Sequence, residues 1–161
     1  PTLQGRKGLI VGIANDKSIA WGCASVMHAW GAELAVTYYN AKAEPHVRPL
    51  AGQVDAPLIL PLNVQDEDQM EAVFAAITAR WGRLDFLVHS IAFASKEDLH
   101  GRVTDCSLEG FLMAMDISCH SFLRLARRAE PLMATGGSLL TVSYYGSEKV
   151  VENYNMMGPV K

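Results

Sequence analysis

The side chains best suited to chemistry lie near the end of the chain, where six residues separate Tyr154 from Lys161. A helix beginning near Asn153 would place both on one face, because this interval is close to two helical turns. An ammonium beside a tyrosine favours the phenolate and can hold a bound ribose, and the phenol can stabilise an oxyanion. Tyr144, at the end of an apolar run, is expected to face the same cleft. The alternative is that the tyrosines are surface residues and Lys161 is a solvated lysine.

A second group lies in the turn after the first apolar run, which reads GIANDKS from Gly12 to Ser18. Gly12 can form a tight turn, and Gly22 can let the following helix approach the sheet closely. The free amides at the helix start, together with Ser18, form an anion site that suits a pyrophosphate. The full G-x-G-x-x-G pattern is absent, so an ordinary loop whose glycines serve only packing is the alternative.

The stretch after the second apolar run bears on the choice of nucleotide. Many dinucleotide folds carry an acidic residue there to bind the ribose hydroxyls, whereas this chain has Tyr39 and Asn40 and no acid before Glu44. No arginine stands in the stretch to receive a 2′-phosphate, and Lys42 is the only nearby base. The stretch therefore favours NAD(H) over NADP(H).

Short apolar runs that alternate with helical patterns predict the scaffold for these residues. The runs predict strands at 8–12, 34–38, 58–60, 84–89 and 138–142. The helical patterns predict helices at 18–30, 41–52, 66–81 and 108–134, and a last one from about 153. This alternation predicts an α/β fold with a doubly wound, Rossmann-like parallel sheet. The ligand site is expected at the carboxyl ends of the strands, where the strand order reverses between the first and the fourth.

Length and composition limit the remaining possibilities. A chain of 161 residues that is 50% hydrophobic suits one domain, 1–161, with a packed core. The net charge of −3 argues against a nucleic-acid partner, and no apolar run is long enough for a membrane span. Three cysteines without a C-x-x-C pair favour a reducing, cytoplasmic location. The five histidines show no metal-ligand spacing, so no metal is expected.

Together these features resemble the short-chain dehydrogenase/reductase superfamily and, within it, the NADH-dependent enoyl-acyl-carrier-protein reductases of bacterial fatty-acid synthesis. The resemblance covers the whole chain and is carried by G-x5-S-I-A-x-G from Gly12 to Gly22, HSIAFA from His89 to Ala94, DIS from Asp116 to Ser118, and Ser143-Tyr144 with Tyr154-x6-Lys161. The usual superfamily motif, Tyr-x3-Lys, would need a tyrosine where Met157 stands. This departure distinguishes an enoyl reductase from a ketone or alcohol dehydrogenase.

The resemblance implies a role for each site residue. Tyr154 is expected to hydrogen-bond the thioester carbonyl, Tyr144 to be the second active-site tyrosine, and Lys161 to hold the nicotinamide ribose. The backbone at Ala94 is expected to face the substrate. The other matched positions bind cofactor: Gly12, Ser18 and Ile19 at the pyrophosphate and ribose, Tyr39, Asn63 and Val64 at the adenosine, and Ser90, Ile91 and Ala92 along the cofactor cleft.

The activity implied by the resemblance is hydride transfer from NADH to the β-carbon of a trans-2-enoyl thioester on acyl carrier protein, in a homotetramer. Two alternatives remain open: a carbonyl or alcohol dehydrogenase of the same superfamily, and a non-catalytic nucleotide-binding fragment. The family's C-terminal strands and substrate flap would follow Lys161. The chain is therefore expected to be an incomplete copy of a longer enzyme, with little activity by itself.

Overall fold

The computed structural model describes residues 2–161, which form two compact units. Among the described residues, the first unit comprises 2–90 and Leu125–Thr141, and it contains the sheet. The second comprises Ile91–Arg124 and Val142–Lys161. No helix within residues 2–161 is long and apolar enough to cross a bilayer.

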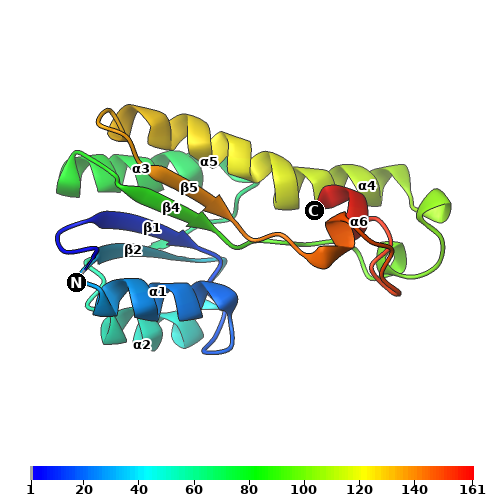
Figure 1. Cartoon of the computed structure of the whole chain (residues 1–161), viewed down its shortest axis with the longest axis horizontal. Coiled ribbons are helices and arrows are strands. Elements are labelled where there is room, and N and C mark those ends of the chain that lie inside the picture. The colour runs from blue at the N-terminus through cyan, green and yellow to red at the C-terminus, as the bar shows by residue number, and fades with distance from the viewer. Residues whose placement is uncertain (1) are drawn as a thin grey trace. The chain divides into compact units, whose positions relative to one another are not determined.

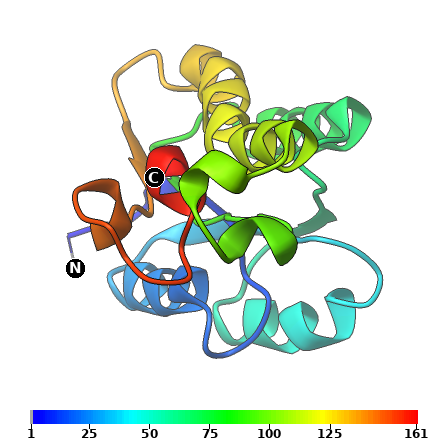
Figure 2. The same cartoon turned by 90° about the vertical axis from the view of Figure 1, so that its right-hand side faces the viewer.

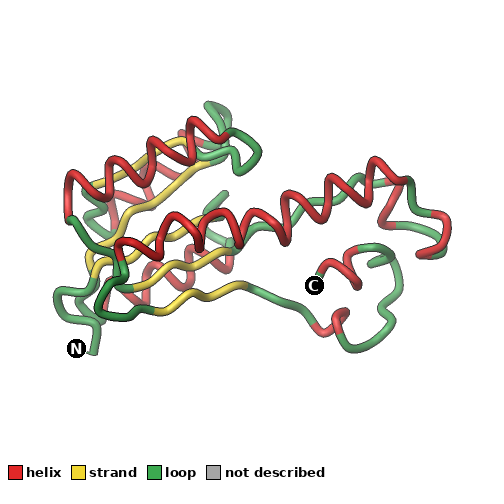
Figure 3. The backbone as a smooth tube through the Cα atoms, turned by 90° about the horizontal axis from the view of Figure 1, so that it is seen from above, coloured by secondary structure: helices red, strands yellow, loops and turns green. Residues whose placement is uncertain are grey.

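The first unit is built on a parallel sheet of five strands in the order β3-β2-β1-β4-β5. The strands are β1 (Lys7–Val11), β2 (Glu33–Tyr38), β3 (Leu58–Pro61), β4 (Phe86–His89) and β5 (Ser138–Thr141). Every neighbouring pair is parallel, and β1 lies between β2 and β4. Figure 3 shows the strands, in yellow, side by side in the sheet. The predicted α/β doubly wound sheet is therefore confirmed, including the reversal between the first and fourth strands.

Helices cover both faces of this sheet. α1 (Ile19–Ala29) and α2 (Glu44–Gln53) lie on one face and α3 (Glu67–Trp81) on the other (Figure 1). α3 begins at a capping pair: the Asp66 carboxylate accepts from the Gln69 backbone N–H at 3.0 Å and from Gln69 Nε2 at 2.9 Å. These bonds satisfy a backbone donor that a free helix end would leave unpaired.

The apolar runs of the central strands form the core of the first unit. Ile10, Leu34 and Leu87 are completely buried, because helices cover β1, β2 and β4 on both faces. β5 is different: it is exposed along its length, and Leu139 and Leu140 are 39% and 47% exposed. Within the described residues β5 pairs with β4 on one side only.

The second unit is mostly helical. Its elements are α4 (Leu108–Met115), a π-helical turn (Asp116–His120), the start of α5 (Ser121–Ala129), and 3₁₀ turns at Glu97–Leu99, Val103–Asp105 and Tyr145–Ser147. The predicted helix over 108–134 is confirmed as far as Ala129, where a 3₁₀ turn (Glu130–Leu132) follows.

A small apolar cluster holds the second unit together. Met156, Met157 and Val160 pack with Ala114 of α4, and all four are buried. Figure 2 shows the short last helix, in red, next to α4, in green. The C-terminal residues are therefore attached to the unit by apolar packing around that helix.

That last helix, α6, is shorter than predicted. It spans only Met157–Val160, so the predicted start near Asn153 is wrong. Asn153 and Asn155 have φ of 57° and 30°, in a left-handed region that interrupts a right-handed helix and that asparagine tolerates well. Tyr154 therefore precedes the helix, and the argument that it shares a helical face with Lys161 fails.

Candidate active site

The cofactor candidates of the first unit begin at the end of β1, where Gly12 has φ of 114°. A side chain is disfavoured there, and a Cβ at Gly12 would lie 2.0 Å from the Ser90 carbonyl oxygen. The Ser90 N–H in turn donates to the Val11 carbonyl oxygen at 2.9 Å. The backbones leaving β1 and β4 thus approach each other closely where the strand order reverses, which is where doubly wound sheets bind nucleotides.

Ser18 shapes the turn before α1 in a way that the sequence did not predict. It stands at the N-cap position, but its side chain makes no capping bond to the helix. Instead, Ser18 Oγ accepts from the backbone N–H groups of Ala14 and Asn15, each at 3.0 Å. The hydroxyl therefore closes the turn, and the first amides of α1 can be offered to an anion. Ile19, the first residue of α1, is 61% exposed.

Gly22 does not have the packing role predicted for it. A Cβ at this position would meet no atom within 4 Å, and the residue is exposed. Ala20 and Ala24 are fully buried, and they are the small residues that bring α1 onto the sheet. The prediction is wrong because Gly22 lies on the outer face of the helix.

Three further candidates follow β2 and β3, whose carboxyl ends are paired neighbours. Tyr39 is 61% exposed, whereas Val64 is buried. Asn63 Oδ1 accepts from the Gln65 N–H at 3.1 Å, and the Asn63 N–H donates to Gln69 Oε1 at 2.8 Å. These bonds orient the Asn63 amide, whose Nδ2 can donate to a nucleobase.

The catalytic candidates lie in the second unit, where Tyr144 and Tyr154 form an edge-to-face pair. Their ring centroids are 4.8 Å apart at an interplanar angle of 63°, which is a favourable aromatic arrangement. Gly146 gives the rings room: a Cβ there would lie 2.6 Å from Tyr154 Cδ1 and 3.2 Å from Tyr144 Cδ1. No motif in the sequence predicts a role for Gly146, and its closeness to Tyr144 in the chain is the feature that could have indicated one.

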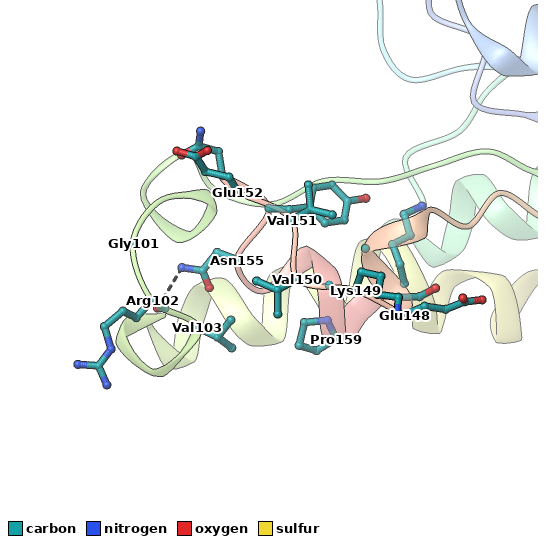
Figure 4. A pocket seen from close by; sticks show the side chains of 16 residues that line it. Gly101, Arg102, Val103, Glu148, Lys149, Val150, Val151, Glu152, Asn155 and Pro159 are labelled. Atoms are coloured by element: carbon teal, nitrogen blue, oxygen red, sulfur yellow. Dashed lines mark hydrogen bonds between the residues drawn. The ribbon is translucent and has the colours of Figure 1, made fainter.

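Lys161 and Tyr154 line the same pocket of the second unit. The pocket has a volume of about 870 Å³ and is shown in Figure 4. Lys161 Nζ donates to the Val142 carbonyl oxygen at 2.8 Å, and the Lys161 carbonyl oxygen accepts from Ser143 Oγ at 3.2 Å. The structure thus brings both tyrosines and the lysine into one unit, with the lysine tied to the start of its C-terminal segment.

Burial determines the protonation of this group. Burial and the neighbouring Tyr144 raise the pKa of Tyr154, and burial lowers the pKa of Lys161. The expectation that Lys161 favours the phenolate is therefore wrong, because Nζ donates to a backbone carbonyl and the phenol is dominated by desolvation. A neutral phenol is a hydrogen-bond donor, as stabilisation of an oxyanion requires.

Ile91, Ala92 and Ala94 open the second unit. Ala92 is exposed, Ile91 and Ala94 are half-buried, and Ala94 packs against the small apolar cluster. Ser118 holds the backbone between them, because its Oγ accepts from the Phe93 N–H at 2.9 Å and donates to the Phe93 carbonyl oxygen at 3.1 Å. The DIS segment therefore anchors this loop through the π-helical turn.

Two asparagines that the sequence analysis did not identify hold Tyr154 in place. Asn155 Nδ2 donates to the carbonyl oxygens of His100 at 2.9 Å and Arg102 at 3.1 Å, the second bond being visible in Figure 4. Asn153 Oδ1 lies 3.1 Å from His100 Nδ1. The signal that could have revealed them is the Asn-Tyr-Asn pattern, since asparagine is typical of turns.

A family model described as "Enoyl-(Acyl carrier protein) reductase" matches residues 12–161. The chain is 48% identical over 159 residues to the enoyl-acyl-carrier-protein reductase (NADH) FabI of Rickettsia typhi, covering 99% of this chain and 61% of that protein. It is 46% identical over 159 residues to the enoyl-acyl-carrier-protein reductase (NADH) 2 of Rhizobium meliloti, covering 99% of this chain and 59% of that protein. The chain thus spans about three fifths of the length of these relatives.

Solved structures agree with this match. The reductase of Anaplasma phagocytophilum in complex with NAD has a TM-score of 0.96 and 49% identity, over 99% of this chain and 61% of that one. A reductase of Bacillus cereus, solved with NADP+ and indole naphthyridinone, has a TM-score of 0.95 and 41% identity, over 99% of this chain and 63% of that one. The chain belongs to the enoyl-acyl-carrier-protein reductase family.

Proposed function

We propose that this chain carries the cofactor site and the catalytic tyrosines of an oxidoreductase of fatty-acid biosynthesis. The reaction is hydride transfer from NADH to the β-carbon of a trans-2-enoyl thioester on acyl carrier protein. One observation supports it above the others: Met157 is 4% exposed within the small apolar cluster, whereas Tyr154 lines the pocket with Lys161. A carbonyl or alcohol dehydrogenase of the superfamily would use a tyrosine at the position of Met157.

The residues of the first unit suit a nicotinamide dinucleotide. The crevice at Gly12 is one that any Cβ would fill, and the first amides of α1 suit a pyrophosphate. The residues proposed to bind cofactor are Gly12, Ser18, Ile19, Tyr39, Asn63, Val64, Ser90, Ile91 and Ala92, with Lys161 at the nicotinamide ribose.

NADH is favoured over NADPH by the residues after β2. Asn40 Oδ1 accepts from the backbone N–H groups of Lys42 and Ala43, at 3.0 and 3.1 Å, and so makes a tight turn. The first guanidinium after β2, that of Arg48, is paired with Glu44 one helical turn earlier. A site for a 2′-phosphate would instead direct such a group at the ligand.

In the proposed mechanism, the dinucleotide supplies the hydride and the chain supplies orientation and a hydrogen-bond donor. As the β-carbon accepts hydride, negative charge moves onto the thioester oxygen. Tyr154, a phenol whose pKa burial raises further above neutrality, donates a hydrogen bond to that oxygen. Tyr144 packs against the Tyr154 ring and keeps its orientation.

We also propose a homotetramer located in the cytoplasm, with acyl carrier protein delivering the substrate. Leu108, Leu112 and Leu123 are 75%, 57% and 59% exposed, and exposed leucines along one helical segment suit subunit contacts. The three cysteines are free thiols, as a reducing compartment favours. Light scattering at several protein concentrations measures the mass of the assembly, and a monomer throughout would contradict the tetramer.

The test of the activity is NADH oxidation with a crotonyl thioester, followed by the absorbance of the reduced nicotinamide. We expect oxidation with the thioester and none with ketones in a chimera that places this chain in the matching segment of the Rickettsia typhi relative, and little activity in the chain by itself. In the chimera, Tyr154→Phe should lower turnover about 100-fold, the usual cost of one lost oxyanion donor.

Two outcomes would contradict the proposal. Turnover of ketones would favour a carbonyl or alcohol dehydrogenase. NADH binding without turnover in the chimera would favour a non-catalytic nucleotide-binding module. Calorimetric titration with NADH, run on the same samples, separates a failure to bind cofactor from a failure of the chemistry.

A further inference from the structure

A buried carboxylate lies in the loop between Ala94 and α4, among residues to which no role has been assigned. Asp98 is only 6% exposed. It accepts hydrogen bonds from Ser95 Oγ, from the Ser107 N–H at 2.8 Å and from Ser107 Oγ at 3.2 Å. Burying a carboxylate costs a large desolvation free energy, and hydrogen-bond donors such as these offset it because they replace the lost water.

These bonds join the two ends of the loop. Ser95 directly follows Ala94, while Ser107 is the N-cap of α4, where its Oγ accepts from the Gly110 N–H at 2.9 Å. Gly110 also leaves space for the carboxylate, because a Cβ there would lie 1.7 Å from Asp98 Oδ2. One side chain therefore closes the loop and fixes it to the start of a helix.

The closed loop packs against the segment that carries the catalytic candidates. Leu99 and Cys106, which lie inside the loop, contact the apolar cluster that contains Met156. Met156 stands between Tyr154 and Lys161 in the chain. A shift of the loop would therefore be transmitted to those two side chains as well as to the backbone at its start.

We propose that Asp98 is a positioning residue for the acyl thioester, which holds loop 94–107 as the substrate-side wall of the site. This inference rests on the proposed function and on the expectation from the family resemblance that the backbone at Ala94 faces the substrate. A wall held by satisfied hydrogen bonds keeps the thioester in a reactive orientation without a further ordering cost at each turnover. If Asp98 served folding alone, replacing it would weaken the binding of every ligand to the same degree.

The variants that test this are Asp98→Ala and Asp98→Asn, with Asp105→Ala as the matched control. Asp105 lies in the same loop, is exposed, and accepts only a long bond of 3.4 Å from Thr104 Oγ1 among its side-chain contacts. Asp98→Asn keeps an oxygen that can accept from the Ser107 N–H, so it should rescue part of the effect.

The first measurement is limited trypsin digestion of the purified chain, which requires no activity. The loop contains Lys96 and Arg102, and Lys42 in the first unit serves as the reference site. In Asp98→Ala, cleavage after Lys96 and Arg102 should accelerate about tenfold relative to cleavage after Lys42, because proteolysis follows the population of the open loop. Asp105→Ala should match the wild type.

The second measurement is made in the chimera with the Rickettsia typhi relative and determines, by calorimetry, the affinity for a crotonyl thioester in the presence of NAD+, which cannot donate hydride. Asp98→Ala should weaken thioester binding about tenfold and NADH binding by clearly less, because the loop contacts the segment that carries Lys161 but lies outside the cofactor candidates of the first unit. Equal losses for both ligands, or wild-type thioester affinity in Asp98→Ala, would overturn the positioning role. If the wild type binds NADH but no thioester, the proposed function itself fails, a result distinct from either.

Discussion

The turn after β1 and the segment after β5 both carry candidate site residues, yet different interactions hold them. In the turn, two backbone segments are in contact: Gly12 lies against the Ser90 carbonyl, next to strands whose apolar side chains are buried. In residues 142–161, side chains do the holding: two tyrosine rings pack together and Lys161 donates to a carbonyl oxygen. Few of these residues are buried.

Because different interactions hold them, the two regions should tolerate different substitutions. Where two backbones touch, any side chain is excluded and the strand ends must move to admit one. Where side chains hold a segment, the backbone can survive a change that misplaces a reacting group. Substitutions in the turn should therefore weaken cofactor binding, whereas substitutions that displace the tyrosine pair of the C-terminal segment should lower turnover and spare it.

Gly12→Ala should have the largest effect. A small effect would contradict the difference between the two regions. The new Cβ would overlap the Ser90 oxygen at 2.0 Å, and φ of 114° is strained for alanine. We expect a loss of about 3 kcal/mol in unfolding free energy from strain and overpacking. Affinity for NADH should fall about 100-fold with it. Urea denaturation and fluorescence titration with NADH measure the two effects.

Gly52→Ala is the matched control for this substitution. Gly52 lies in α2, where a Cβ would meet no atom within 4 Å. Alanine there should raise stability by about 0.5–1 kcal/mol, because glycine is a poor helix former. Similar losses for the two variants would show that Gly12 is not special.

The first region was also the more predictable from sequence. Its strands are short apolar runs between turn residues, a pattern that follows from burial on both faces of a parallel sheet. The exception is Gly22, since a glycine at a helical position can face the sheet or the solvent, and the motif does not say which. The structure places it outside, and alanines make the approach.

For the C-terminal segment, the sequence predicted which side chains are candidates but not the conformation of the backbone that carries them. The tyrosines and the lysine were identified by residue type and spacing, yet the helix assumed to align them begins only at Met157. The turn at Asn155 depends on bonds to the carbonyl of His100, 55 positions earlier in the chain. A contact so distant in sequence leaves no local periodic signal, so the side-chain geometry could not be predicted.

Gly146→Ala should have the second-largest effect, and it tests the C-terminal segment in the way that Gly12→Ala tests the turn. The backbone of Gly146 can accommodate alanine, but the new Cβ would lie 2.6 Å from Tyr154 Cδ1 and would displace the ring. A shift of this kind in a reacting group should lower turnover about 100-fold. Steady-state NADH oxidation with a crotonyl thioester measures it.

Two readouts decide whether that loss comes from the tyrosine. Affinity for NADH should stay near the wild-type value, and unfolding free energy should fall by only about 1 kcal/mol, the lower end of overpacking costs. Loss of NADH affinity in proportion to turnover would mean that the two regions are not separable. Gly52→Ala again serves as the neutral reference, because its Cβ would stand in open space.

The smallest expected effect lies at the amino ends of β1 and β2, far along the strands from the candidate cofactor residues. Glu33 accepts from Lys7 Nζ at 2.8 Å and from Trp81 Nε1. The bond from Lys7 lowers the pKa of Glu33, burial opposes that shift, and the bond from Trp81 adds to it. Glu33→Gln should lower unfolding free energy by about 1 kcal/mol at neutral pH and leave NADH affinity and turnover unchanged.

The pH dependence of that loss follows from the lowered pKa. The carboxylate stabilises the fold above the ordinary glutamate pKa of about 4.3, and the contribution disappears as the pH falls through the lower folded-state value. Wild type and Glu33→Gln should therefore converge in urea denaturation once the pH falls below the lowered folded-state pKa of Glu33. Lys7→Met provides the control, because Glu33→Gln should cost less in its background if the ion pair is the cause. A constant difference at every pH would contradict the carboxylate charge as the cause of the loss.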